Sequence, residues 1–499
     1  MSDDRRLAET PFGYFDLDTR EYVITTHATP TPWINYLGLE GKLCAIVSNT
    51  ACGPTWLKDP LERRITRYFQ VGSSRDRPGR WLYVRDNDTG EFWSATWQPV
   101  VSARPDQYEC RHGLGYTRIT SLHRHIQTEL LHLIPLGRQV EIQRVTVRNT
   151  GDAPRRLSLF TYREFVNGTA ANDLTNVQYS GHIAQVDPDP DDTRILYVTT
   201  PQERPGPLPF CAVSRAPDGF DTKLATFIGD GSVETPQVVR EGVSHGSLAG
   251  QDTAVGVFRL DISLEPGEAA TFDVLVGMAA GRDAVPAVLE QWLDGDDRVP
   301  AALDELKHHA ADLLSALQCN VPDPHMQVMV NTWNAYQCWV NFLFSRSISG
   351  YALGLRRSMG TRDSLQDLLG YMHLAPDRAR ERLIEIIRAT QLTNGSCRHQ
   401  YSALTGEGSE EAGYSDDHLW TILATAAYVK ETGDLSLLDE EVSYSDGREL
   451  SEDVFSHLLR AVRYSFSDRG AHGLPRLRAA DWNDTIGDGP DDEAREKRE

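Results

Sequence analysis

Apolar and polar residues alternate along much of the chain up to about residue 280. Phe258, Leu260, Ile262 and Leu264, for example, alternate with polar neighbours. A period of two places every second side chain of a strand against a core. Many short segments of this kind, separated by turn residues, predict a large antiparallel β-sandwich over residues 1–280.

One strand-like stretch, residues 139–149, departs from this regular pattern. Its alternation changes phase between Ile142 and Val145 before a turn closes the segment. An extra residue in one strand of a pair produces such a change, so a β-bulge is predicted here.

The hydrophobic period changes after residue 280. Val285, Val288 and Leu289 recur at helical spacing, and a leucine-rich stretch follows up to Leu317. Apolar residues three and four positions apart are typical of an amphipathic helix. Residues 281–322 are therefore predicted to form a helical linker.

The pattern stays helical from Asp323, which is placed to cap a helix with Pro324 in its first turn. Core packing explains a set of apolar and aromatic residues that share one face: Met326, Val330, Trp333, Tyr336, Val340 and Phe344. Further helices are predicted at 363–372, 376–391, 416–431 and 452–468. With longer loops at alternate junctions, these helices predict part of an α/α-barrel over residues 323–499.

Composition narrows the classes of function. The chain has 499 residues and a formal charge of −22, which disfavours binding to a phosphate backbone. The sequence shows neither a long apolar run for a membrane span nor the apolar core of a signal peptide. Its seven scattered cysteines, without a Cys-x-x-Cys pair, fit reduced thiols. We therefore expect a cytoplasmic protein of two or three domains without nucleic-acid or membrane partners.

The densest group of chemically useful side chains lies near the C-terminal end. Asp481, Trp482, Asn483 and Asp484 follow a Gly-Leu-Pro turn. An indole ring can stack on the face of a pyranose, and a carboxyl group can protonate a glycosidic oxygen. Asp and Asn also form turns and cap helices, and a neighbouring Trp often simply packs. These residues alone leave both a sugar site and a structural turn open.

A second stretch, residues 354–367, combines glycines with Arg and Asp side chains. Glycine allows the backbone to approach a ligand closely, and the forked side chains match sugar hydroxyls or an anion. A surface loop with a helix cap at Asp363 or Ser364 explains the same residues. His399 and His418 are single histidines far apart in the sequence, so no metal site is predicted.

Ten short blocks of sequence lie in both halves of the chain. The second half carries RSMGTRDSLQDLLG at 357–370, PDRARER at 376–382, HQY at 399–401, DDHLW at 416–420 and ADWND at 480–484. The first half carries FGYFD at 12–16, YVIT at 22–25, PWINYLG at 32–38, RITRY at 64–68 and ECRHGLGYT at 109–117. In sequence and in order along nearly the whole chain, these blocks resemble the inverting phosphorylase family that contains cellobiose, cellodextrin and chitobiose phosphorylases. The blocks of the first half point to the cellobiose branch.

The resemblance implies a β-sandwich, a helical linker and an (α/α)6 barrel, usually in a homodimer. The implied reaction is phosphorolysis, in which cellobiose and inorganic phosphate give α-glucose 1-phosphate and glucose without a cofactor. By motif match, Asp484 is the general acid and Trp482 lies in the sugar site. Arg357 and Asp363 match residues that hold the transferred glucosyl unit. Arg346 matches an arginine that contacts phosphate.

The chemistry of phosphorolysis agrees with a single acidic residue. An inverting hydrolase needs a second carboxylate that activates water. Phosphate arrives as an anion, so one carboxylic acid and a cationic cradle suffice. Asp484 has to hold its proton until it donates, and the negative charges of Asp481 and of bound phosphate favour that protonated form.

The sequence also departs from the family. Family members continue for several hundred residues, so this sequence contains about half of the barrel helices and leaves an open edge with apolar helix faces. Thr485 stands where cellobiose phosphorylases commonly have Cys, and Thr361 stands where an aromatic residue is usual. Both differences leave the acceptor sugar open, with cellobionic acid as an alternative substrate.

Two other functions remain open at this stage. One is hydrolysis on an α/α-barrel, which needs a second carboxylate such as Glu410, Asp416 or Asp417. The other is a carbohydrate-binding fragment without catalytic activity.

Overall fold

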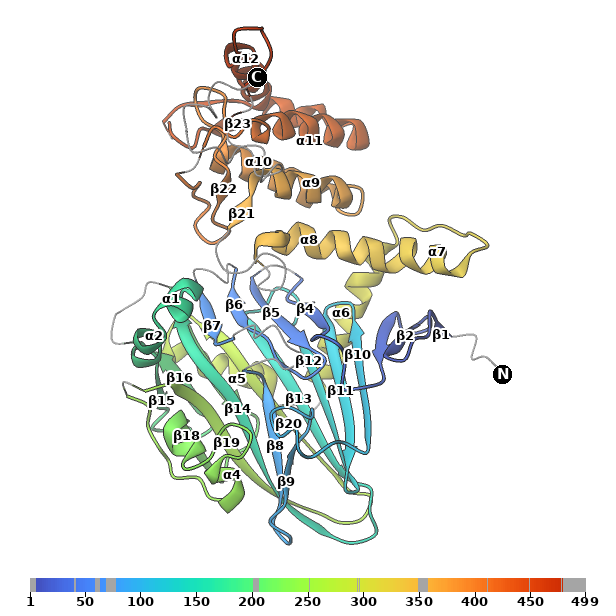
Figure 1. Cartoon of the computed structure of the whole chain (residues 1–499), viewed down its shortest axis with the longest axis vertical. Coiled ribbons are helices and arrows are strands. Elements are labelled where there is room, and N and C mark those ends of the chain that lie inside the picture. The colour runs from blue at the N-terminus through green and yellow to red at the C-terminus, as the bar shows by residue number, and fades with distance from the viewer. Residues whose placement is uncertain are drawn as a thin grey trace. The chain divides into compact units, whose positions relative to one another are not determined.

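The computed structural model describes residues 6–478 apart from 40–41, 59–62, 69–77, 201–205, 251, 294, 296, 349–357, 411, 448 and 477. The chain divides into two compact units, Met1–Ala311 and Asp312–Glu499. Figure 1 shows strands through most of the first unit and helices through most of the second.

The described strands of the first unit form two antiparallel sheets (Figure 1). The eleven-stranded sheet contains, in spatial order, β1 (Arg6–Leu7), β2 (Gly13–Asp16), β3 (Glu21–Ile24), β10 (Gln107–Gly113), β11 (Tyr116–His123), β12 (Ile126–Leu133), β13 (Val140–Asn149), β20 (Ala269–Ala279), β17 (Leu208–Val213), β16 (Ile195–Thr199) and β15 (Gln185–Pro188). The nine-stranded sheet contains β18 (Gly219–Lys223), β19 (Ala254–Leu264), β14 (Arg155–Gly168), β7 (Arg64–Thr66), β6 (Thr55–Leu57), β5 (Leu43–Ser48) and β4 (Ile34–Leu37), with β8 (Trp81–Asp86) paired to β14 and to β9 (Phe92–Ser94).

The main hydrophobic core of this unit is built from both sheets. Val145 and Val147 of β13 belong to the same buried cluster as Leu157 and Leu159 of β14. The two sheets therefore pack face to face, and the predicted antiparallel β-sandwich is confirmed.

The predicted β-bulge between Ile142 and Val145 is wrong. β13 pairs with β12 in an unbroken register from Asn149 to Ile142. The alternation changes phase because Glu141 and Gln143, polar residues on the same face as Val145, are buried. Both polar side chains have partners inside the sandwich.

Two arginines meet these buried polar side chains of β13. Arg80 forms an ion pair with Glu141, and Arg80 Nη2 lies 3.1 Å from Glu141 Oε2. Arg163 Nη2 donates a hydrogen bond to Gln143 Oε1 at 2.6 Å. All four side chains are buried, so a polar network occupies positions where the sequence pattern expects apolar residues.

Helices cover parts of the sandwich and lead out of it. The short ones are α1 (Ala170–Thr175), α2 (Val177–Ile183), α3 (Leu224–Ile228), α4 (Gln237–Glu241) and the 3-10 turn η1 (Arg282–Ala284). The residues expected to form a linker, 281–322, contain α5 (Val285–Leu293) and α6 (Arg298–Leu314). α5 packs on β17 and β20.

The second unit consists mainly of helices joined by short strand pairs. Its elements are α7 (Pro324–Val328), the π-helical turn η2 (Met329–Trp333), α8 (Asn334–Ile348), β21 (Met359–Gly360), α9 (Thr361–Tyr371), α10 (Pro376–Thr390), β22 (Gln400–Tyr401), α11 (Asp417–Thr432), η3 (Leu435–Asp439), β23 (Glu441–Ser443), β24 (Ser451–Asp453) and α12 (Val454–Ser467).

Local signals in the sequence explain where several helices begin and end. The Asp323 side chain accepts hydrogen bonds from the His325 and Met326 amides and so caps α7 as predicted. Asp453 caps α12 in the same way, through the Ser456 amide. α11 ends at Gly433, which has a left-handed φ of 72°.

The helices of the second unit pack in a regular way. α9 contacts α8 and α11, α10 contacts both α9 and α11, and α12 contacts α11. This pairing of α9 with α11, with α10 against both, is the kind of arrangement expected for part of an α/α-barrel. A β-sandwich followed by a helical domain is thus confirmed. None of the helices among the described residues is long and apolar enough to cross a membrane.

The aromatic stripe predicted from Met326 to Phe344 is buried towards its C-terminal end. Tyr336, Val340 and Phe344 are buried, whereas Met326 is 55% exposed. Core packing therefore explains the part of the stripe on α8, and the part on α7 lies at the surface.

α12 carries a second apolar face that is exposed. Phe455, Leu459, Val462 and Phe466 are between 38% and 62% exposed and follow helical spacing. The opposite face of the helix, with Val454, His457 and Ala461, is buried. α12 therefore packs one face against the core and leaves apolar side chains exposed on its outer side.

Candidate functional site

The predicted substrate residues differ in how much of them the structure describes. Asp484, Trp482 and Arg357 lie outside the described residues. Arg346 belongs to α8 and directly follows Ser345, whose φ of 48° interrupts the helix. Asp363 is half-buried in the first turn of α9. The described surroundings of these positions, all in the second unit, therefore define the candidate site.

A two-stranded hairpin holds the segment that leads into α9. Met359 pairs with Tyr401 and Gly360 pairs with Gln400. The Thr361 amide donates to the His399 carbonyl at 2.9 Å. The Thr361 hydroxyl donates to the Arg398 carbonyl at 2.6 Å, and Thr361 is buried. The HQY block thus fixes the backbone of residues 359–361.

Gly360 leaves space for the Asp363 carboxylate. A Cβ atom at position 360 would lie 2.9 Å from Asp363 Oδ2. Any side chain here would therefore displace the carboxylate, which otherwise folds back over the start of α9. At the first turn of a helix, that negative charge is also favoured by the helix dipole.

A histidine–aspartate pair joins β22 to the start of α11. His399 Nδ1 lies 3.0 Å from Asp417 Oδ2, and both side chains are buried. The Tyr414 ring stacks on the imidazole at 3.7 Å between centroids. Burial raises the pKa of Asp417 to about 6, although the hydrogen bond from His399 opposes this effect.

The neighbouring carboxylate links α11 to α9. Asp416 Oδ2 lies 3.3 Å from Arg362 NH1 and accepts a hydrogen bond from Trp420 Nε1 at 3.3 Å. Arg362 immediately precedes Asp363, so this ion pair and the hairpin both hold the first turn of α9.

The described end of the segment that carries Asp484 in the sequence is anchored close to α12. Arg478 forms a two-pronged ion pair with Asp468, at 2.9 Å and 2.6 Å. Asp468 is the C-cap residue of α12 and interacts electrostatically with His418 of α11. The described end of this segment is thus held at the C-terminal end of α12.

His418 is a structural histidine in this arrangement. Its Nε2 lies 2.7 Å from Ser465 Oγ, and its ring meets that of Tyr464 edge to face. Burial lowers the pKa of His418 to about 4, so the imidazole stays neutral near pH 7. Within the described parts of the chain, no group of three or more His, Cys, Asp or Glu side chains is arranged to hold a metal ion.

The sequence pattern points to the HQY and DDHLW blocks but does not predict which contacts their residues make. It gave no role to Gln400, and it did not foresee the Asp468–Arg478 ion pair. The signals were weak because Gln400 lies in a three-residue block, and because Asp468 lies at the end of an ordinary amphipathic helix.

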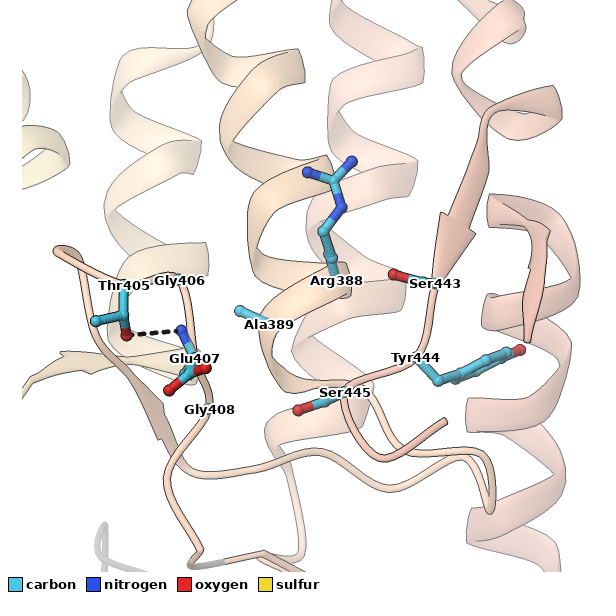
Figure 2. A pocket seen from close by; sticks show the side chains of 9 residues that line it. All are labelled: Arg388, Ala389, Thr405, Gly406, Glu407, Gly408, Ser443, Tyr444 and Ser445. Carbon is cyan, nitrogen blue, oxygen red and sulfur yellow. Dashed lines mark hydrogen bonds between the residues drawn. The ribbon is translucent and has the colours of Figure 1, made fainter. Parts of the chain in front are cut away.

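The helical unit also contains a polar pocket of about 230 Å³ between α10, the loop after β22 and the loop after β23 (Figure 2). It is lined by Arg388, Ala389, Thr405, Gly406, Glu407, Gly408, Ser443, Tyr444 and Ser445. Figure 2 shows the Arg388 side chain extending along α10, away from Glu407. Asp363, the predicted substrate residue whose side chain the structure describes, does not line this pocket.

Comparison with known proteins shows the family. The model of the glycosyl hydrolase 94 supersandwich domain matches residues 20–295. The model of the glycosyl hydrolase 94 superfamily catalytic domain matches residues 309–494. The chain belongs to the glycosyl hydrolase 94 family.

Several relatives of this family member are named as disaccharide phosphorylases. An N,N'-diacetylchitobiose phosphorylase of Vibrio furnissii is 32% identical over 95% of this chain and 62% of its own length. A 3-O-β-D-glucopyranosyl-β-D-glucuronide phosphorylase of Paenibacillus borealis is 29% identical over 95% of this chain and 59% of its own. A cellobionic acid phosphorylase of Neurospora crassa is 25% identical over 82% of this chain and 50% of its own.

This glycosyl hydrolase 94 chain spans about six tenths of the length of the first curated relatives it matches, 62% and 61%. The predicted resemblance to inverting phosphorylases is confirmed at the level of the family.

Proposed function

We propose that the chain is the substrate-binding and acid-bearing part of a glycosyl hydrolase 94 phosphorylase that acts on a disaccharide. The observation that carries the proposal is the match to both family domains along the chain, with disaccharide phosphorylases among the relatives. The most specific form of the proposal is phosphorolysis of cellobiose to α-glucose 1-phosphate and glucose.

In the proposed reaction, an oxygen of inorganic phosphate attacks the anomeric carbon of the glucosyl unit from the face opposite the leaving sugar. The bond between that carbon and the bridging oxygen breaks, and Asp484 transfers its proton to the departing oxygen. Attack from the opposite face inverts the configuration, so the β-linked substrate gives an α-phosphate. Phosphate is the co-substrate, and no cofactor is proposed.

The remaining predicted residues receive roles in binding. Arg357, Asp363 and Trp482 are proposed to hold the glucosyl unit, and Arg346 is proposed to contact phosphate. Asp363 supports this proposal because its carboxylate has space over Gly360 and because the first turn of α9 is held by β22 and Asp416. Rigid support of this kind keeps binding groups within reach of a bound sugar.

A hydrolase is the less well supported alternative. Asp417 is buried and paired with His399, so its carboxylate is poorly placed to activate water. Asp416 already meets Arg362 and Trp420. Glu410 is exposed, with no contact described that would orient it.

The open question about the substrate is which acceptor sugar the disaccharide contains. Cellobiose follows from the resemblance of the first-half blocks, whereas the relatives include enzymes named for N,N'-diacetylchitobiose and cellobionic acid. These three disaccharides, compared side by side, form the natural substrate panel. A homodimer in the cytoplasm is proposed as the setting of the reaction.

The test is an assay of α-glucose 1-phosphate with the purified chain, each disaccharide of the panel, and buffers with and without phosphate. We expect product only with phosphate, and the Asp484→Asn variant should lose it by a factor of about 100 or more. Sugar release in phosphate-free buffer would support hydrolysis instead. Sugar binding without turnover, equal in Asp484→Asn, would support a carbohydrate-binding fragment.

A further inference from the structure

The side chain of Gln400 accepts a backbone hydrogen bond from the segment before α9. Its Oε1 atom lies 3.1 Å from the Ser358 amide nitrogen. Ser358 directly follows Arg357 in the sequence, and Gln400 is half-buried on β22. This bond adds to the ladder between β21 and β22, because it reaches one residue beyond the paired strands.

β22 is itself held firmly at both of its ends. On one side, His399 pairs with Asp417 at the start of α11. On the other, the Tyr401 hydroxyl lies 3.3 Å from Arg382 NH1 of α10, and Tyr401 is buried. The Ser409 amide donates to the Gln400 carbonyl at 2.8 Å. Gln400 therefore acts from a strand whose position is fixed by two helices.

The hydrogen bonds from this strand bracket the segment between two predicted glucosyl-binding residues. Gln400 holds the amide of Ser358, next to Arg357, and the His399 carbonyl holds the amide of Thr361, two residues before Asp363. A fixed spacing between these two amides holds the backbone of residues 358–361, which leads into the first turn of α9 and Asp363.

We propose that Gln400 is a positioning residue for residues 358–363, which carry the predicted glucosyl-binding residue Asp363. It does not touch the sugar in this proposal. Its amide oxygen orders the backbone on one side of β21, as the His399 carbonyl does on the other. The proposal rests on the proposed function for its catalytic consequence, while the ordering itself depends on the geometry alone.

The variants separate the acceptor from the size of the side chain. Gln400→Met keeps a similar length and removes the acceptor, whereas Gln400→Glu keeps an acceptor oxygen. Thr405→Ala is the matched control because Thr405 lies in the exposed loop after β22 and only caps its own turn, through the Glu407 amide.

The first measurement is hydrogen–deuterium exchange of the backbone amides on the whole chain. In Gln400→Met we expect about three- to tenfold faster exchange at residues 358–361, because a typical hydrogen bond is lost. Exchange in α10 should not change, and Gln400→Glu and Thr405→Ala should resemble the wild type. Equal exchange at 358–361 in Gln400→Met and wild type would overturn the proposal.

The second measurement is phosphorolysis of cellobiose over a range of concentrations. We expect KM to rise about three- to tenfold in Gln400→Met with a smaller fall in kcat, and Gln400→Glu to restore most of the loss. A lower kcat with unchanged KM, not restored in Gln400→Glu, would contradict a positioning role. A wild-type chain without phosphate-dependent turnover would contradict the proposed function, and the exchange measurement would still decide whether Gln400 orders residues 358–361.

Discussion

At position 360 the chain has no side chain, and the Asp363 carboxylate lies where one would be. The backbone at Gly360 has a φ of −68° and a ψ of 136°, which any residue can adopt. Glycine is therefore needed here for space and not for an unusual backbone conformation. The start of α9 can accept a larger residue only if Asp363 moves.

Gly360→Ala is expected to lower kcat/KM for the disaccharide by about tenfold or more, because a small displacement of a binding group is costly to catalysis. The melting temperature should change little, since the atom that must move is the end of a side chain. Gly250→Ala is the control because a Cβ there meets nothing within 4 Å. A large fall in stability with normal activity would contradict this account.

Asp417 is expected to make stability depend on pH. Burial raises its pKa from 3.8 to about 6, so the folded protein binds this proton more tightly than the unfolded chain does. Between about pH 4 and pH 6, rising pH therefore removes stability, by at most about 3 kcal/mol for this group. His418 acts in the opposite sense over this range, because burial lowers its pKa to about 4.

The difference between wild type and Asp417→Asn isolates the carboxyl group. We expect the variant to gain stability relative to wild type as pH rises from 4 to 6.5, measured as the free energy of unfolding in urea at each pH. Asp439→Asn, which changes an exposed aspartate of η3, serves as the control. Parallel curves for wild type and Asp417→Asn would contradict the assignment.

At the scale of single elements, β13 shows how a polar network takes the place of an apolar stripe. Glu141 is buried with Arg80, and the Thr55 hydroxyl donates to the same carboxylate at 2.5 Å. The Arg80 guanidinium holds the pKa of Glu141 below its ordinary value, against the effect of burial. Removing one partner leaves a buried charge without compensation.

Glu141→Gln is expected to destabilise the first unit by about 3–5 kcal/mol, because Arg80 would remain charged and buried. Urea unfolding followed by tryptophan fluorescence measures this effect, since Trp56, Trp81 and Trp93 are buried in this unit. Glu265→Gln, at a strand end with an exposed side chain, is the control. A loss below about 1 kcal/mol would mean that the pair contributes like an exposed salt bridge.

At the scale of the whole molecule, α12 exposes four large apolar side chains, those of Phe455, Leu459, Val462 and Phe466. Leu419 and Leu423 of the neighbouring helix α11 are also exposed, at 44% and 47%. Apolar patches on this scale promote association and binding of hydrophobic probes.

The double variant Phe455→Ser, Phe466→Ser is expected to bind a hydrophobic fluorescent dye several-fold less than wild type and to elute with less aggregate. Helix content from circular dichroism should be retained, because neither side chain is buried. The control Ser456→Ala, Ser467→Ala changes polar residues of the same helix. Unchanged dye binding in the double phenylalanine variant would show that the dye does not bind at the exposed face of α12.

Much of the architecture could be read from the sequence because periodicity reflects burial. A hydrophobic period of two residues predicted the strands that form the sandwich. The helices predicted at 376–391 and 416–431 agree closely with α10 and α11. The pattern failed at β13, where Glu141 and Gln143 are buried polar residues. Periodicity cannot distinguish a buried ion pair from a solvent-facing side chain, because both appear as polar letters.

The sequence by itself determined the family and the candidate residues Arg346, Arg357, Asp363, Trp482 and Asp484, since motif order and residue chemistry are properties of the chain. Tertiary structure alone decided what supports the first turn of α9. Gln400, Asp416 and Gly360 act through contacts between residues up to 54 positions apart, as in the Arg362–Asp416 pair. Such contacts arise from the packing of α9, α10 and α11, and local sequence carries no record of which partners that packing brings together.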